Sequence, residues 1–299
     1  MNLVEEIQRL KQERNALILA HNYQLPDVQD IADFTGDSLE LSRKATEITA
    51  DVIVFCGVHF MAETAAILNP GKTVLLPDPR AGCPMADMIT GQQLRDFKVQ
   101  HPGAKVVCYV NSTAEVKAES DCCCTSGNAA KIVAHYANAE VLFVPDQHLG
   151  GVVEEILGRK LILWPGYCPT HARIHPKDIL DLKAAHPKAL ALAHPECPKP
   201  VRDVSDQILS TGQMCKFVHE NQATEFIIAT EEGLLHRLRK ENPAKTFYRV
   251  SPFALCPNMK RITLEKVYFS LRDMNTVIRV EEPIASRARR AIEQMLAWS

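Results

Sequence analysis

Three Cys-Pro pairs stand at similar intervals along the chain. Cys83, Cys168 and Cys256 each follow an apolar run and precede a proline, and their spacings are 85 and 88 residues in a chain of 299. This spacing predicts three repeated units that each offer one sulfur to a shared centre. Three thiolates suit a zinc ion with an open position, or a [4Fe–4S] cluster with one iron that lacks a protein ligand. A metal ion with an open coordination position is a Lewis acid that can bind a hydroxyl or a carboxylate during a dehydration.

The spacing of the three cysteines alone does not identify the metal. His171, three residues after Cys168, could serve as a fourth ligand, which would favour a closed zinc site. A fourth pair, Cys197-Pro198, is out of phase with the other three, and we expect its thiol to lie near the site without being a ligand. The remaining cysteines are expected to pack as small core side chains: Cys56, Cys108, Cys122, Cys123, Cys124 and Cys215.

Polar residues recur at the same intervals where three apolar strands are predicted to end. The strands that begin at Ala16, Ala104 and Ala189 are offset by 88 and 85 residues. In parallel sheets the ligand crevice lies beyond the carboxyl ends of the strands. We therefore predict one cavity that gathers the residues at these strand ends and the residues two positions further on: His21, Tyr109 and His194, and Tyr23, Asn111 and Glu196.

Hydroxyl residues mark a third recurring position, just before helical patterns at 39–49, 128–137 and 213–220. Ser38, Ser126 and Thr211 keep the offsets of 88 and 85, and each is a plausible helix N-cap. A helix N-terminus offers free N–H groups and the positive end of the helix dipole, so it binds anions readily. Three such N-termini around one cavity predict a substrate with several negative groups, such as carboxylates and a phosphate.

Continuous apolar strands alternate with helical patterns throughout the chain, which is typical of a parallel α/β sheet. We predict three homologous three-layer αβα domains in a pseudo-threefold arrangement around the central cavity. Their expected ranges are 1–83, 84–168 and 169–256, followed by a C-terminal segment at 257–299. The helix predicted at 283–298 in that segment is expected to complete the first repeat.

Composition narrows the class of protein. A net charge of −2 gives no reason to expect nucleic acid or an acidic membrane as a partner. No apolar run approaches the roughly 20 residues of a membrane span, and the first 14 residues are predicted to form a charged amphipathic helix instead of a signal peptide. Ten cysteines without an export signal indicate a cytoplasmic protein, where patterned cysteines are more often metal ligands than disulfides.

Several longer motifs give the chain a family resemblance over essentially its whole length. With the three dispersed cysteines, it resembles quinolinate synthase (the NadA family) in Ala20-His-Asn-Tyr-Gln24, Gly36-Asp-Ser38, Tyr109-Val-Asn-Ser-Thr113, His194-Pro-Glu-Cys197 and Ser210-Thr-Gly-Gln-Met214. The resemblance implies three α/β domains around a [4Fe–4S] cluster, and so favours iron–sulfur over zinc. It also implies synthesis of quinolinate, a precursor of NAD, from iminosuccinate (iminoaspartate) and dihydroxyacetone phosphate, with release of phosphate and water.

The resemblance implies roles for individual residues as well. Cys83, Cys168 and Cys256 become the cluster ligands, and eight residues become substrate contacts: His21, Ser38, Tyr109, Asn111, Ser126, His194, Glu196 and Thr211. Loss of phosphate and isomerisation of a triose need a base and an acid, for which we expect Glu196 and Tyr109. His21 and His194 are expected to hold the anionic groups during catalysis, and the open iron would polarise the hydroxyl that leaves as water.

Two other functions fit the same residues. A different [4Fe–4S] hydro-lyase acting on a small polycarboxylate would use the same open iron but no triose phosphate. A non-enzymatic protein, either a cluster-bearing sensor or a zinc-stapled repeat protein, would need the cysteines but not the acid, base and anion-binding groups at the strand ends. If the resemblance holds, an enzyme that produces iminosuccinate is an expected functional partner.

Overall fold

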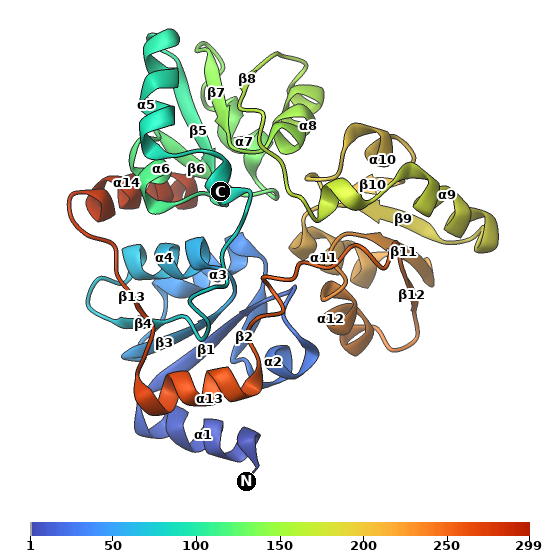
Figure 1. Cartoon of the computed structure of the whole chain (residues 1–299). Coiled ribbons are helices and arrows are strands. Elements are labelled where there is room, and N and C mark those ends of the chain that lie inside the picture. Colours follow the sequence, from blue (N-terminus) through green and yellow to red (C-terminus); the bar gives the residue numbers. More distant parts are fainter. Residues whose placement is uncertain (1) are drawn as a thin grey trace.

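The chain folds into three α/β units, each built on its own sheet (Figure 1). The structure is a computed structural model, and it describes residues 2–299. The central strands are short, apolar and buried, as expected for parallel strands that are covered by helices on both faces. Figure 1 shows the three units meeting near the middle of the molecule.

The first unit contains both the start of the chain and part of its end. Its strands are β1 (Ala16–His21), β2 (Phe34–Gly36), β3 (Val52–Cys56), β4 (Thr73–Leu75) and β13 (Val277–Ile278). Its helices are α1 (Leu3–Glu13), α2 (Pro26–Ile31), α3 (Ser38–Thr46), α4 (His59–Leu68) and α13 (Leu264–Asp273). β13 pairs antiparallel with β4, while all other pairs in this sheet are parallel.

The second unit is entirely parallel in its sheet. Its strands are β5 (Lys105–Tyr109), β6 (Cys122–Cys124), β7 (Val141–Val144) and β8 (Ile162–Leu163). Its helices are the 3-10 helix η1 (Ala86–Met88), α5 (Gly91–Gln100), α6 (Ala114–Ala118), α7 (Ala129–Ala134) and α8 (Gln147–Leu157).

The third unit repeats this plan. Its strands are β9 (Leu190–Ala193), β10 (Gln207–Ile208), β11 (Glu225–Ala229) and β12 (Thr246–Arg249). Its helices are the 3-10 helix η2 (His171–Arg173), α9 (Pro176–Ala185), α10 (Lys199–Asp203), α11 (Thr211–Glu220) and α12 (Leu234–Glu241).

The strand order confirms the predicted α/β class with three αβα units. The parallel strands are ordered β2-β1-β3-β4, β6-β5-β7-β8 and β10-β9-β11-β12, so each unit places its second strand at one edge and its first strand next to it. Each of the predicted strands at Ala16, Ala104 and Ala189 is therefore an inner strand of its sheet. The exact domain boundaries after residues 83, 168 and 256 stay a prediction.

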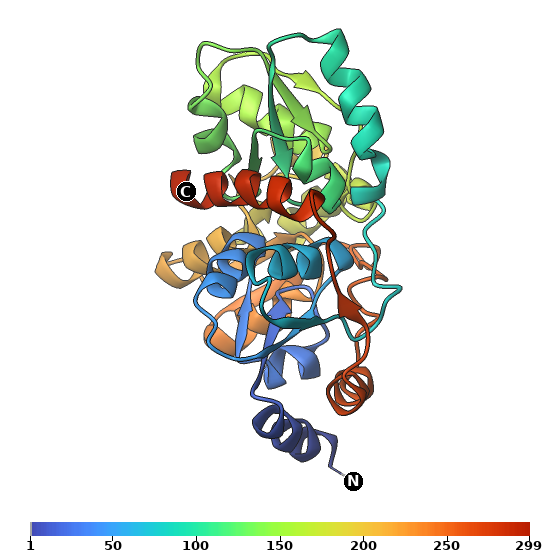
Figure 2. The ribbon, with the colours of Figure 1, turned by 90° about the vertical axis from the view of Figure 1, so that its left-hand side faces the viewer.

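The last helix of the chain lies elsewhere than expected. α14 (Ile284–Trp298) packs mainly against α6 and β6 of the second unit and touches α4 of the first. Figure 2 shows it lying between these two units. The first unit is completed instead by β13, which extends its sheet, and by α13, which packs on α1 and β3. The apolar face of α14, including Ala288, Ala291, Ile292 and Met295, is buried in the core of the second unit.

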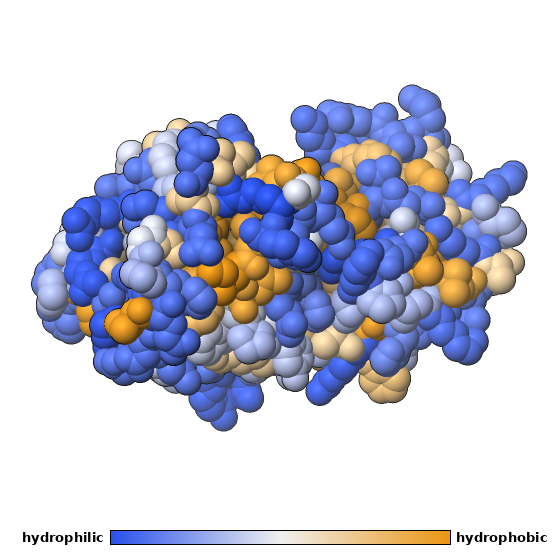
Figure 3. Space-filling view, turned by 90° about the horizontal axis from the view of Figure 1, so that it is seen from above, coloured by the Kyte–Doolittle hydropathy of each residue, from blue (hydrophilic) through white to orange (hydrophobic). Residues whose placement is uncertain are grey.

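Two large apolar cores join the units. One contains the first sheet together with buried residues of the third unit, and the other contains the second sheet with α14. Seen from above, the surface is mainly hydrophilic, and apolar side chains gather in the hollow between its two halves (Figure 3). Among residues 2–299, no helix has the length and apolar character required to cross a membrane.

Candidate active site

One cavity of about 190 Å³ lies where the three units meet. Its wall contains every residue that the sequence predicted for the site: Cys83, Cys168, Cys256, His21, Tyr23, Ser38, Tyr109, Asn111, Ser126, His194, Glu196 and Thr211. These residues converge because each lies at the carboxyl end of a strand or in the loop that follows it. The carboxyl ends of the strands face the centre in all three units.

The three cysteines occupy equivalent turns. Backbone N–H groups two or three residues after each cysteine favour its thiolate form: those of Met85 and Ala86 for Cys83, of His171 for Cys168, and of Asn258 and Met259 for Cys256. The proline after each cysteine has no N–H of its own and stiffens the turn. Burial raises the pKa of these thiols, to about 12 for Cys83, while the N–H groups favour the thiolate. The N–H groups therefore offset part of the effect of burial on the three thiols.

The other seven cysteines are buried, as predicted, and none forms a disulfide. Cys197 lies under the site, where its sulfur contacts the carbonyl of Ala229 at 3.4 Å. Cys122, Cys123 and Cys124 form β6, which α14 covers. Their small size suits a strand that a helix approaches closely.

Glu196 is the centre of the polar contacts. Its Oε1 accepts hydrogen bonds from the Tyr109 hydroxyl at 2.6 Å and from Asn111 Nδ2 at 3.2 Å, and its Oε2 lies 2.7 Å from His171 Nδ1. Burial opposes its ionisation, but His171 and the Tyr109 hydrogen bond outweigh burial and hold the pKa of the carboxyl below its ordinary value. Burial and the adjacent Glu196 charge raise the pKa of Tyr109. The pair is thus a carboxylate beside a protonated phenol.

A series of close polar contacts runs from Glu196 through His171 to the first unit. His171 Nε2 contacts Thr230 Oγ1 at 2.8 Å, and Thr230 Oγ1 contacts the Tyr23 hydroxyl. A carboxylate, an imidazole and a hydroxyl in this order resemble the arrangement that activates hydroxyl groups in hydrolases. Thr230 was not predicted from the sequence, and His171 was predicted only as a possible metal ligand. Cys168, His171 and Glu196 also have ligand atoms within 4.8 Å of one another, so this set could hold a metal ion.

His21 and His194 are neutral donors to the cavity. His21 Nδ1 accepts the backbone N–H of Tyr23 at 3.1 Å, and His194 Nδ1 accepts that of Glu196 at 3.3 Å. Burial lowers the pKa of each imidazole to about 3. Because Nδ1 is an acceptor in both rings, the single proton of each neutral ring is on Nε2.

The helix N-caps lie one residue earlier than predicted in two units. Asp37 caps α3, with its Oδ1 accepting the N–H groups of Leu39 and Glu40, and Ser210 caps α11. The predicted caps Ser38 and Thr211 are the first helical residues. Asp-Ser and Ser-Thr each offer two adjacent residues that can cap, so the sequence pattern leaves this choice open. Ser126 is not a cap either, because α7 begins at residue 129 and Asn128 occupies its cap position.

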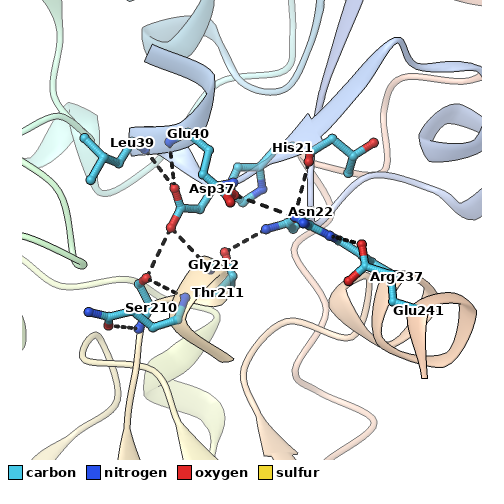
Figure 4. Close-up of polar contacts among 12 residues, drawn as sticks. His21, Asn22, Asp37, Leu39, Glu40, Ser210, Thr211, Gly212, Arg237 and Glu241 are labelled. Atoms are coloured by element: carbon cyan, nitrogen blue, oxygen red, sulfur yellow. Dashed lines mark hydrogen bonds and ion pairs between the residues drawn. The ribbon is translucent and has the colours of Figure 1, made fainter. Parts of the chain in front are cut away.

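The carboxylate of Asp37 is bound at the N-terminus of α11. Asp37 Oδ2 accepts hydrogen bonds from Ser210 Oγ at 3.1 Å and from the N–H of Gly212 at 3.2 Å (Figure 4). A side chain at position 212 would place its Cβ 2.7 Å from that oxygen, which explains the glycine. Asp37 thus occupies two helix N-termini that were predicted to bind substrate anions, and leaves the hydroxyls of Ser38 and Thr211 on the cavity wall.

Glu231 is a buried acid that was not predicted from the sequence. Its oxygens accept the N–H groups of Cys256 at 3.0 Å and Gly233 at 2.7 Å, and Lys260 Nζ lies 2.9 Å away. Burial raises the pKa of Glu231, and Lys260 opposes that effect. It stands two residues after β11, the position that Asp146 holds after β7, so the offset of 85 residues could have found it. Glu231 fixes the turn that carries Cys256.

Comparison with known proteins relates nearly the whole chain to one group. A family model described as "Quinolinate synthetase A protein" matches residues 5–297. A protein of Dehalococcoides mccartyi named "Quinolinate synthase" is 60% identical over 291 residues, which cover 97% of this chain and 96% of that protein. Proteins with the same name from Thermodesulfovibrio yellowstonii and Methanosarcina barkeri are each 53% identical, over 294 and 295 residues, and 97% of each is covered.

Proposed function

This chain belongs to the quinolinate synthetase A protein family, and we propose that it is a quinolinate synthase of NAD biosynthesis. It condenses iminosuccinate with dihydroxyacetone phosphate to give quinolinate, phosphate and water. The observation that carries the proposal is the cavity, which gathers three cysteines, a paired carboxylate and phenol, and neutral imidazole donors from three units. Neither a sensor nor a zinc staple requires such an acid–base pair at its centre.

The donor set fits a [4Fe–4S] cluster on Cys83, Cys168 and Cys256. Three half-buried cysteines on a cavity wall, with N–H groups near their sulfurs, are suited to such ligation. The preference for an iron–sulfur cluster over zinc at these three ligands rests on the membership of the quinolinate synthetase A protein family. When bound, the cluster supplies a Lewis-acidic iron for the loss of water.

Glu196 and Tyr109 supply the proton chemistry. Glu196 stays ionised beside His171 and serves as the base, while Tyr109, whose pKa is raised, keeps its proton and serves as the acid. The contacts from Glu196 through His171 and Thr230 to Tyr23 link the base to a second phenol on the cavity wall. Asn111 Oδ1 is buried and has no hydrogen-bond partner among residues 2–299, so it is free to accept a hydrogen bond from an imine or hydroxyl of the substrate.

Neutral hydrogen-bond donors and one arginine are available to bind the anionic groups of the substrates. The cavity wall carries three acidic residues, Asp37, Glu196 and Glu231, and among residues 2–299 its one lysine or arginine is Arg173. Arg173 is exposed on η2, and its side chain forms no ion pair or hydrogen bond with residues 2–299. A guanidinium matches the geometry of a phosphate group. We propose that Arg173 binds the phosphate of dihydroxyacetone phosphate, while His21 and His194 donate to the carboxylates.

The test uses protein purified without oxygen. It should show broad absorbance near about 400 nm and form quinolinate, detected by mass spectrometry, from the two substrates together. Turnover without the triose phosphate would instead support a hydro-lyase acting on a polycarboxylate. Colourless protein with stoichiometric zinc and no product would overturn the proposal.

The setting proposed for the reaction is the cytoplasm. Ten cysteines without a disulfide support a reducing compartment. Its partners are then the two small substrates and an enzyme that produces iminosuccinate, with no role for nucleic acid or membrane.

A further inference from the structure

Asn22 connects an arginine outside the cavity to a hydroxyl on the cavity wall (Figure 4). It follows β1 directly and is fully buried. Its Oδ1 accepts a hydrogen bond from Arg237 of α12 at 3.0 Å, and its Nδ2 donates to Thr211 Oγ1 at 3.0 Å. Arg237 and Thr211 both belong to the third unit, so the amide of the first unit bridges two groups of another unit.

The direction of this chain is fixed by Arg237. A guanidinium has hydrogen-bond donors and no acceptor, so only the oxygen of the Asn22 amide can face it. Arg237 cannot turn away easily, because it also donates to Glu241 at 2.8 Å and to the carbonyl of Thr35 at 3.2 Å. The NH₂ end of the amide must therefore face Thr211.

The hydroxyl of Thr211 consequently keeps its own proton for another partner. Thr211 is 2% exposed, lines the cavity, and makes no other side-chain hydrogen bond with residues 2–299. Its oxygen accepts from Asn22, so its O–H is left to donate to whatever occupies the cavity. Carboxylate and phosphate oxygens are acceptors and need such a donor.

We infer that Asn22 and Arg237 are positioning residues that make Thr211 a hydrogen-bond donor to an anionic oxygen of a substrate. The inference rests on the proposed function only for the identity of that substrate. Neither residue lines the cavity, so each acts through Thr211.

The test is an isosteric change that reverses the hydrogen bond. The carboxylate of Asn22→Asp has no donor, so Thr211 would turn its proton toward it and away from the substrate, while Arg237 gains an ion pair. We expect the KM for one of the two substrates to rise about tenfold, with kcat within about threefold. Thr211→Val should raise the KM for the same substrate by the same factor. The double variant should equal Thr211→Val within about twofold.

Matched measurements separate this effect from others. Asn221→Asp adds the same charge at a residue whose side chain is only an acceptor, for the N–H of Ala223, and should leave both KM values unchanged. If Asn22→Asp does not fold, Arg237→Met serves instead, because it frees the amide to turn over and should also raise that KM. Calorimetric affinities for succinate and for inorganic phosphate test the inference without turnover, so an absence of quinolinate synthesis would refute the proposed function alone. Normal KM and affinity in Asn22→Asp, or effects that multiply in the double variant, would overturn the inference.

Discussion

Replacing Glu196 by glutamine tests the acid–base assignment most directly. The amide oxygen of Glu196→Gln can still accept the hydrogen bonds of Tyr109 and Asn111, so the shape of the site should persist. What disappears is the negative charge beside His171 and the capacity to take a proton. A positioned general base contributes about 10²–10⁴ in rate, so quinolinate formation should fall by that factor, or about 3–5 kcal/mol in activation free energy.

The assay is quinolinate formation at saturating substrate without oxygen, with the absorbance near about 400 nm recorded on the same samples. Glu119→Gln is the matched control, because Glu119 is also buried and pairs with Arg95 and Arg287, yet it does not line the cavity. We expect full absorbance in both variants and loss of turnover in Glu196→Gln alone. A rate for Glu196→Gln within tenfold of the unmodified protein would refute the assignment.

Three further outcomes are expected. Arg173→Gln should raise the KM for dihydroxyacetone phosphate at least about tenfold. Arg43 is an exposed arginine of α3 that does not line the cavity, so Arg43→Gln should leave this KM unchanged. Equal effects of the two substitutions would refute phosphate binding by Arg173. Serine at position 83, 168 or 256 should abolish the absorbance, and Cys122→Ser should retain it; absorbance in any of the first three would contradict the ligand set. The folded pKa of His21 is about 3, below the unfolded value of about 6.5, so its contribution to stability is complete above pH 6.5 and declines toward pH 3, by about 1.4 kcal/mol per pH unit. Urea midpoints of His21→Asn should therefore depend less on pH in that window, and an unchanged dependence would contradict a neutral buried ring.

The repeat made much of the fold predictable from the sequence. The strands at Ala16, Ala104 and Ala189 are apolar, bounded by turns and equally offset, so their local pattern agrees with the final sheets. The position of α14 was not predictable in this way. The apolar stripe of α14 indicates that one face of the helix is buried, but it does not indicate against which unit. The unit that α14 packs against depends on which face the other elements leave uncovered, and this is known only from the folded chain.

The site was predictable where the repeat placed equivalent residues together, as at His21 and His194. Thr230 was missed because its role depends on contacts between units, with His171 and Tyr23, which no periodic pattern encodes. Two of the three caps lie one residue earlier than predicted, because neighbouring side chains such as Asp37 and Ser38 have similar capping ability. The sequence thus indicates which strand ends meet, and the structure decides which atoms contact one another.

The placement of α14 also has a consequence for synthesis on the ribosome. β6 is an edge strand made of Cys122, Cys123 and Cys124, and the helix that covers it begins at Ile284, about 160 residues later. While the ribosome makes the third unit, the nascent second unit keeps three thiols and an apolar sheet face open to oxidants and to other chains. A chain that stops before α14 would leave that face uncovered, so β6 is protected only after α14 has been synthesised.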